Sequence, residues 1–172
     1  MKKLLLMVFL CISFIGKAQI TKNNWMVGGD ARFSYNTYSS ESISRSGYSI
    51  SLSPNIGYFI YDKLAVGSKI NYIIGNRNST IIQLGPFVRY YFLEKEKKVN
   101  LFLEPSYYFG LDKLNKDYSN FSTKVGTAIF LNSSVALELA LNYSMVKLKS
   151  SDYSSNSLNL GVGFQIHLEK EK

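Results

Sequence analysis

The stretch Ser157–His167 reads SLNLGVGFQIH, and apolar and polar or small residues alternate along it without a break. One side of the alternation carries large apolar residues only: Leu158, Leu160, Val162, Phe164 and Ile166. The other side carries Asn159, Gly161, Gly163 and Gln165. A period of two residues is typical of a β-strand with unlike faces. The stretch therefore predicts a strand that separates an apolar environment from a polar one.

Seven further segments show the same alternation. The eight predicted strands are Trp25–Tyr35, Tyr48–Phe59, Leu64–Ile74, Thr80–Phe92, Asn100–Leu111, Phe121–Leu131, Val135–Met145 and Ser157–Leu168. Short connections alternate with longer ones rich in Ser, Asn and Tyr, which are Asn36–Gly47, Gly75–Ser79, Asp112–Asn120 and Val146–Asn156. Outer-membrane barrels have short periplasmic turns and longer outer loops. We predict an all-β fold, an eight-stranded antiparallel up-and-down transmembrane β-barrel, with both chain ends on the periplasmic side.

The charged residues of the predicted strands all fall on one face. No Asp, Glu, Lys, Arg or His falls on the predicted outward face. A charged side chain in lipid at mid-depth costs about 2–4 kcal/mol, so a bilayer would impose this segregation. The predicted lumen charges are Asp30, Arg32, Lys69, Arg89, Glu104, Lys124 and Glu138, with His167 near the periplasmic end. Most of the 12 glycines also fall inward, where small residues make room for long charged ones.

The register of one hairpin predicts an ion pair inside the lumen. If Phe92 lies opposite Leu101 across the connection Leu93–Val99, antiparallel pairing places Arg89 opposite Glu104. Directly opposed Cβ atoms lie about 4.5–5.5 Å apart, within reach of two opposite charges. Counted from the same end, Asp30, Lys69 and Glu138 reach similar depths on other strands. We expect a network of both signs that plugs the barrel, because an unpaired buried ion is costly.

The chain is rich in aromatic residues, with 13 Tyr and 11 Phe. Outward aromatic residues near strand ends predict two interfacial belts. At the periplasmic end we place Trp25, Tyr58, Tyr90 and Phe92. At the outer end we place Tyr35, Tyr48, Tyr72, Tyr107, Phe109 and Tyr143. The two bands should lie about 25 Å apart, whereas one buried aromatic cluster would indicate a soluble protein.

The first residues have the features of a secretion signal. Lys2 and Lys3 precede the apolar run Leu4–Ile15, which is too short for a membrane helix, and small residues stand at Gly16 and Ala18. We predict a signal peptide over residues 1–18 and one barrel domain over residues 19–172. Cys11, the single cysteine, lies within the apolar run after Leu10, which argues against a lipidation site.

Pro54, Pro86 and Pro105 all lie inside predicted strands. Proline removes a donor from the hydrogen-bond ladder and is normally confined to edges, strand starts or bulges. Since a closed barrel has no edge, we expect local bulges at these three positions, or strand breaks near a barrel end.

Three segments support a family resemblance: Pro54–Phe59 (PNIGYF), Asp62–Gly67 (DKLAVG) and Gly85–Phe92 (GPFVRYYF). Over essentially the whole chain after residue 18, the sequence resembles the outer-membrane β-barrel domain family common in Bacteroidetes-type bacteria, whose members are similar in shape to OmpA and OmpX. The resemblance implies residence in the outer membrane, contact with its lipid and handling by the barrel-assembly machinery during biogenesis. It implies no catalytic residues. The charged end after Leu168 departs from the aromatic terminus that such barrels often have.

The residues themselves indicate no enzyme, cofactor or metal site. The single histidine lacks an identifiable catalytic partner, and no cluster of metal ligands is visible. No basic stripe indicates nucleic-acid binding despite the net charge of +8, and we expect a monomer. Three function classes stay open: a structural or surface-display barrel, including adhesion; a narrow channel or transport accessory; and a soluble lipocalin-like carrier or lipid-modifying barrel enzyme. What the loops bind is not indicated.

Overall fold

The computed structural model describes residues 20–40, 43–75, 80–111, 118–148 and 154–169, and these form eight β-strands. The strands are β1 (Trp25–Ser40), β2 (Ile43–Tyr61), β3 (Leu64–Gly75), β4 (Thr80–Tyr91), β5 (Val99–Gly110), β6 (Tyr118–Phe130), β7 (Val135–Leu148) and β8 (Ser154–Leu168). No helix among the described residues is long and apolar enough to cross a membrane.

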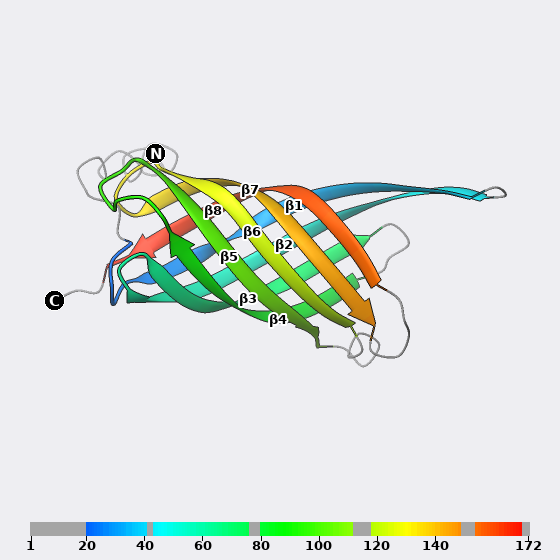
Figure 1. The fold of residues 1–172 in the computed structure, drawn as a ribbon, viewed down its shortest axis with the longest axis horizontal. Helices are drawn as coiled ribbons and strands as arrows, with labels where there is room; N and C mark the ends of the chain where they lie inside the picture. The colour runs from blue at the N-terminus through cyan, green and yellow to red at the C-terminus, as the bar shows by residue number, and fades with distance from the viewer. Residues whose placement is uncertain (1–19, 41–42, 76–79, 112–117, 149–153, 170–172) are drawn as a thin grey trace, which may run out of the picture.

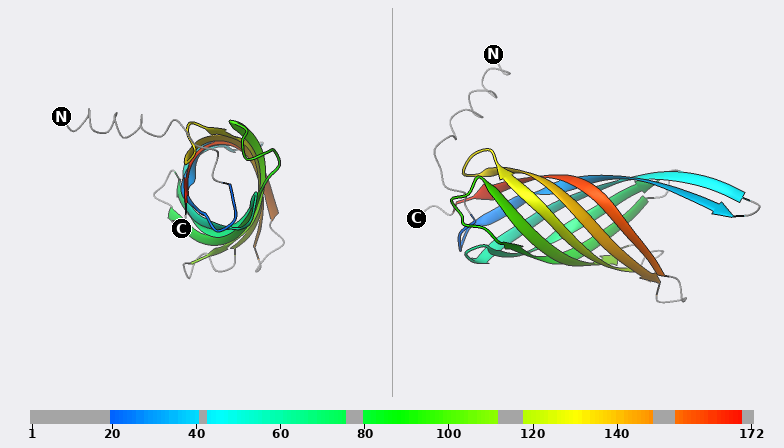
Figure 2. Two further views of the ribbon diagram at one scale, coloured as in Figure 1. Left: turned by 90° about the vertical axis from the view of Figure 1, so that its left-hand side faces the viewer. Right: turned by 45° about the horizontal axis from the view of Figure 1, so that its top comes forward.

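Each strand pairs antiparallel with the next, and β8 closes the ring by pairing with β1. The predicted eight-stranded antiparallel barrel is therefore confirmed (Figure 1). Seen from one end, the wall is a closed ring (Figure 2). Trp25 pairs with Leu168, so the first and last strands begin and end at the same rim as the short connections. We call this rim the turn end and the opposite rim the arm end.

The register of β4 and β5 has the predicted value. Each pair of residues across these strands has numbers that add up to 193, as in Tyr91 with Phe102 and Gln83 with Gly110. The constant sum places Arg89 opposite Glu104, as the sequence of this hairpin predicts.

The connection predicted over Asn36–Gly47 is wrong, because most of it is strand. β1 and β2 stay paired up to Ser40 with Ile43. Within the described part of the chain, however, β1 pairs with β8 only as far as Arg32, and β2 pairs with β3 only from Ser49. The outer parts of β1 and β2 therefore form a two-stranded arm, residues 33–40 and 43–48, that projects beyond the barrel (Figures 1 and 2).

Two other predicted loops are also shorter than expected. Residues 118–120 belong to β6, while residues 146–148 and 154–156 belong to β7 and β8. Their Ser and Asn content suggested turns, since these side chains bond to nearby backbone. The alternation of residue size and pairing with a neighbouring strand outweigh that preference here.

The three prolines do not produce the expected bulges. Within the described strands, the one shift of register lies between Phe59 and Tyr61 in β2, away from every proline. The ladder next to each proline loses residue pairs, but the register continues unchanged on both sides. Proline removes a donor without adding a residue, so the strand keeps its course.

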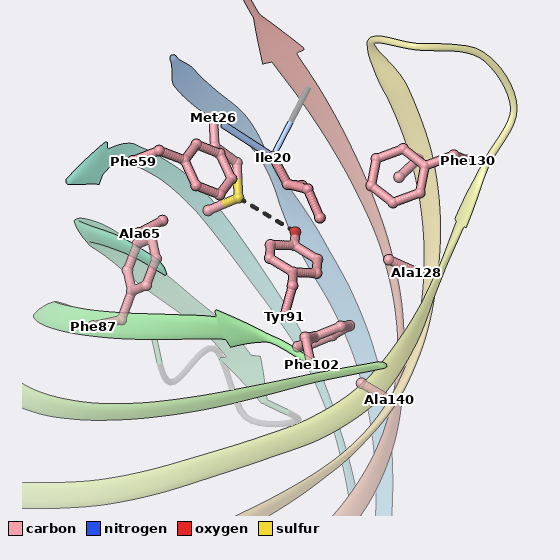
Figure 3. Packing of buried hydrophobic residues seen from close by; sticks show 11 residues of the cluster. Ile20, Met26, Phe59, Ala65, Phe87, Tyr91, Phe102, Ala128, Phe130 and Ala140 are labelled. Atoms are coloured by element: carbon pink, nitrogen blue, oxygen red, sulfur yellow. Dashed lines mark hydrogen bonds between the residues drawn. The ribbon is translucent and has the colours of Figure 1, made fainter. Parts of the chain in front are cut away.

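The turn end of the lumen is closed by apolar side chains. Ile20, Met26, Phe59, Tyr91 and Phe102 are all fully buried and pack together with nearby alanines (Figure 3). The segment before β1 is held beneath the rim, because the amide of Lys63 donates to the Ile20 carbonyl at 2.9 Å.

The arm should be dispensable for the barrel. We expect that replacing residues 36–47 with Asn-Gly, a favoured two-residue hairpin turn, leaves the thermal unfolding midpoint unchanged within error, because the removed pairs contact only each other. Circular dichroism melting of the refolded protein measures this. A lowered midpoint would show that the arm supports the wall.

Candidate functional site: the charged lumen

The lumen is divided into three layers along the barrel. Apolar side chains fill the turn end, charged side chains fill the middle, and hydroxyl and amide side chains fill the region toward the arm end. The sequence predicted the charged layer alone. The lumen is therefore not polar throughout, and the apolar layer corrects that expectation.

Arg89 on β4 is the centre of the charged layer and has no exposed surface. Its Nε donates to Oε2 of Glu104 on β5 at 2.6 Å. Its two terminal nitrogens donate to Glu138 on β7, and one of them also donates to the Tyr91 hydroxyl at 3.0 Å. The guanidinium lies 4.4 Å from the centre of the Phe102 ring. One cation thus bridges two carboxylates from different strands, which a guanidinium can do because its donors are fixed in a fork.

Two lysines extend the network around the barrel. Lys69 on β3 pairs with Oε1 of Glu104 and lies 4.8 Å from the centre of the Phe87 ring. Lys124 on β6 approaches the same Glu104 oxygen at 3.3 Å and pairs with Asp30 on β1 at 2.5 Å. Glu104 therefore accepts from three cations, and the network reaches from β1 to β7.

Arg32 connects the charged layer to the layer of amides and hydroxyls. Its Nε lies 3.2 Å from Asp30, and a terminal nitrogen donates to Ser53 at 2.9 Å and to Asn71 at 3.2 Å. Asn71 in turn donates to Gln83 at 3.0 Å. The structure thus brings all seven predicted lumen charges into one connected set of ion pairs.

Small residues make the room that these long side chains need. A Cβ at Gly163 would lie 3.1 Å from a Glu138 oxygen, and one at Gly161 would lie 3.0 Å from Arg32. The cavity lined by Asp30, Arg32, Lys124 and Glu138 has a volume of only about 10 Å³. That is close to the space of one water molecule, so the charged layer fills its cross-section at this point.

His167 lies in the apolar layer and is fully buried. Its ring contacts the rings of Phe59, Tyr91 and Phe130, and its Nε2 lies 3.4 Å from the Tyr91 hydroxyl. Within the described residues, no group of three or more His, Cys, Asp or Glu side chains is arranged to hold a metal ion. The surroundings of His167 are those of a packed side chain beneath the rim.

Sequence reasoning missed two parts of the lumen. The apolar layer is formed by the inward residues closest to the turn end of the strands. These residues could have been found by following the inward face of each predicted strand to its end. Ile20 lies outside every predicted strand, and no periodic signal places it in the rim.

The predicted belt residues lie on the outer face wherever their side chains are described. Trp25, Tyr90 and Phe92 are exposed at the turn end, and Tyr58 is half-buried against Trp25 with ring centres 5.0 Å apart. Exposed residues toward the arm end are Tyr48, Tyr72, Tyr107, Phe109 and Tyr143. The side chain of Tyr35 lies outside the described part. These residues form no buried cluster, while the 25 Å spacing of the belts stays a prediction.

Comparisons with known proteins show the fold but no family. No protein-family model matches the chain, and no curated protein matches it. Among solved structures, the chain is similar to Neisserial surface protein A (NspA), with 15% identity over 83% of this chain and 96% of that one and a TM-score of 0.54. It is also similar to a de novo designed transmembrane β-barrel, with 10% identity over 86% of this chain and 98% of that one and a TM-score of 0.51.

A third solved structure is the outer membrane protein OprG from Pseudomonas aeruginosa, with 14% identity over 90% of this chain and 98% of that one and a TM-score of 0.46. At these identities the likeness to NspA and to the designed barrel supports the small eight-stranded barrel fold and nothing finer. Membership of the Bacteroidetes-type family stays a prediction.

Proposed function

We propose that this chain is an integral outer-membrane β-barrel whose lumen is plugged by its own side chains and whose role is structural or one of surface display. The observation that carries the proposal is the outer surface of the barrel. Large apolar side chains are exposed on all eight strands, among them Phe33, Leu52, Val125, Leu139 and Leu158, which are 45–66% exposed.

A soluble monomer rarely exposes contiguous apolar patches beyond a few hundred Å². On this barrel the exposed apolar side chains surround the whole wall. Among the described strand side chains, the charged ones lie on the inside, except Lys147, which is exposed near the arm end of β7. A soluble carrier barrel would have the opposite arrangement, with an apolar interior to hold its ligand. The distribution therefore supports a lipid environment and disfavours the lipocalin-like alternative.

The closed lumen supports a structural role over a channel. Arg89, Glu104 and Glu138 lie across its middle, and the apolar layer beneath them closes the turn end. An ion crossing the barrel would have to displace both layers. The narrow channel and transport accessory stay as the second candidate, because four cations against three carboxylates leave the charged layer with a surplus of positive charge.

The arm supports surface display. It extends from the rim opposite the start of β1 and the end of β8, and it has unpaired backbone along both of its sides within the described residues. An extended segment of another polypeptide can add to such an edge by backbone hydrogen bonds. An adhesive role would therefore depend on this arm more than on any other described part of the barrel.

Fractionation tests the location. We expect the protein, expressed in a Gram-negative host, to sediment with outer-membrane markers in a sucrose gradient and to resist extraction with sodium carbonate, because its apolar outer wall is stable only in lipid. The measurement is an immunoblot of gradient fractions. Recovery in the soluble periplasmic fraction would contradict the proposal.

Arg89→Ala should destabilise the barrel strongly. Removing one partner from a buried ion-pair network typically costs about 3–5 kcal/mol, and here two carboxylates lose their shared cation. We expect a clear fall in the urea unfolding midpoint. The fluorescence of Trp25 measures the unfolding. The matched control Lys97→Ala, in an exposed turn, should change the midpoint little. Equal midpoints for the two variants would argue against the plug.

Planar-bilayer recording tests the lumen. We expect the wild-type protein to give no steady conductance steps above the protein-free baseline, since both the charged and the apolar layers block the path. Insertion is verified separately by protease protection of the reconstituted protein. A large and stable open conductance would overturn the plug and support the channel.

A further inference from the structure

Two apolar grooves lie on the outer wall, one on each side of Pro54. The first has a volume of about 390 Å³ and lies over β1, where Gly29 and Ala31 have too little side chain to fill it. Its sides are outward residues of the neighbouring strands: Leu52, Pro54, Leu137, Val162 and Phe164. This volume is within the range of pockets that hold small ligands, about 300–1,000 Å³. The groove is therefore large enough for a hydrocarbon chain.

The second groove has a volume of about 380 Å³ and lies over β2 and β3. Its apolar sides are Pro54, Ile56, Ile70 and Leu84. The Ser68 hydroxyl in this groove donates to the Gly85 carbonyl at 3.5 Å, so it is directed to the wall. Neighbouring strands lie about 4.8 Å apart, so the two grooves are separated by about 5–10 Å. Two chains of one lipid can therefore lie on either side of Pro54.

At the turn end of the same strand, a bulge turns Tyr61 to the outer face. Paired numbers in β2 and β3 add up to 124 as far as Phe59 with Ala65, and then to 125 for Tyr61 with Leu64. Without this shift Tyr61 would face the lumen, as Phe59 does, because successive residues of a strand alternate between faces. Its side chain is instead 63% exposed. The bulge thus places an aromatic ring on the outer rim below the grooves.

The side chain of Lys22 lies over this ring. Its ammonium is 5.5 Å from the centre of the Tyr61 ring, and its backbone amide donates to the Asp62 carboxylate at 2.8 Å. The next residue, Asn23, accepts from the Tyr58 hydroxyl at 3.1 Å. These two bonds fix the turn before β1 against β2. A cation and two tyrosines are thereby held together at the rim, where amphipathic side chains contact lipid headgroups.

Lys22 is the most accessible cation of this part of the rim. Lys63 lies 3.5 Å from Glu94, and Lys95 lies 3.8 Å from Asp62. Both of these lysines are half-buried, whereas Lys22 is exposed. An anion that approaches this rim from outside therefore meets the Lys22 ammonium first.

The grooves and the rim are separated by about the depth of one bilayer leaflet. Tyr61 is seven residues beyond Pro54, which is about 23 Å along a strand at about 3.3 Å per residue. With a strand tilt of about 40°, this length is about 18 Å along the barrel axis. One half of the hydrocarbon core of a bilayer is about 15 Å thick. An acyl chain whose headgroup lies at Tyr61 would therefore reach the grooves.

We propose that the outer wall over β1, β2 and β3 binds one anionic phospholipid from the leaflet at the turn end. Its phosphate lies against Lys22 and Tyr61, and its two acyl chains lie in the grooves on either side of Pro54. An anionic headgroup is favoured over a zwitterionic one, because a choline group brings a second cation close to the Lys22 ammonium. The inference rests on the proposed membrane position and names a lipid partner for that wall.

Native mass spectrometry of the refolded protein in detergent micelles tests the headgroup contact. We expect one dioleoyl phosphatidylglycerol to bind about fivefold more tightly than dioleoyl phosphatidylcholine, as one lysine near a lipid phosphate allows. Lys22→Gln should abolish this preference, and the matched change Lys97→Gln, in an exposed turn at the same end, should preserve it. Equal affinities in the wild type, or equal effects of the two changes, would overturn the proposal. Displacement of the lipid by glycerol phosphate, which has no chains, would also overturn it.

Filling the grooves tests the chain contacts. Ala31→Leu together with Ser68→Leu should weaken the binding of both lipids several-fold and leave their ratio unchanged, because the chains are the same. The matched change Thr127→Leu adds the same side chain to the outer face of β6, on the far side of the ring, and should leave both affinities unchanged. An unchanged melting midpoint in lipid-free detergent verifies that the variants fold. A loss of binding in Thr127→Leu as large as that in the double variant would refute a defined lipid position.

Vesicles separate this inference from the proposed function. The ring of Trp25, the single tryptophan, lies 5.0 Å from that of Tyr58, between the rim and the grooves. In phosphatidylcholine vesicles, phosphatidylglycerol with brominated chains should quench Trp25 more strongly than an equal amount of brominated phosphatidylcholine. Equal quenching in a barrel that has inserted would overturn the lipid position alone. Failure of the barrel to insert would contradict the proposed function as well.

Discussion

Closure of the strand ring is the constraint on which the rest of this structure depends. Within the wall, each strand has a neighbour on both sides, so most backbone donors and acceptors bond to a neighbouring strand, with interruptions beside Pro54, Pro86 and Pro105. Closure fixes an inside and an outside, and the period of two then assigns every strand residue to one of them. The apolar exterior, the charged interior and the two rims all follow from this assignment.

An interior of this size must be filled by side chains, and the manner of filling determines what the barrel can do. Charges from β1, β3, β4, β5, β6 and β7 meet in one layer because facing positions are occupied by glycine or alanine. The clearest case is Gly163, where a Cβ would lie 3.1 Å from a carboxylate oxygen of Glu138. A polar layer fixed in this way specifies the pairing of distant strands, since a strand shifted by one residue would turn its charges toward the apolar outer face.

Much of this arrangement could be predicted from the sequence, because alternation and charge segregation are local signals. The register of β4 with β5 and the positions of all seven lumen charges needed only an index sum and a face assignment. The arm could not be predicted, because its Ser and Asn residues favour turns and pairing between β1 and β2 overrides them. The fate of the prolines was also inaccessible, since it depends on which neighbour each residue bonds. Ile20 enters the rim through a backbone bond to Lys63, for which the sequence has no periodic sign.

The arm has a consequence for how this protein can vary. Its residues pair with each other through the same register as the barrel part of β1 and β2, in which paired numbers add up to 83. One residue added to each strand near the tip would lengthen the arm and leave every barrel contact in place. The arm can therefore change in length and composition without altering the contacts that stabilise the barrel. The filled interior constrains the sequence of the barrel part, whereas pairing in the arm constrains only its own two strands.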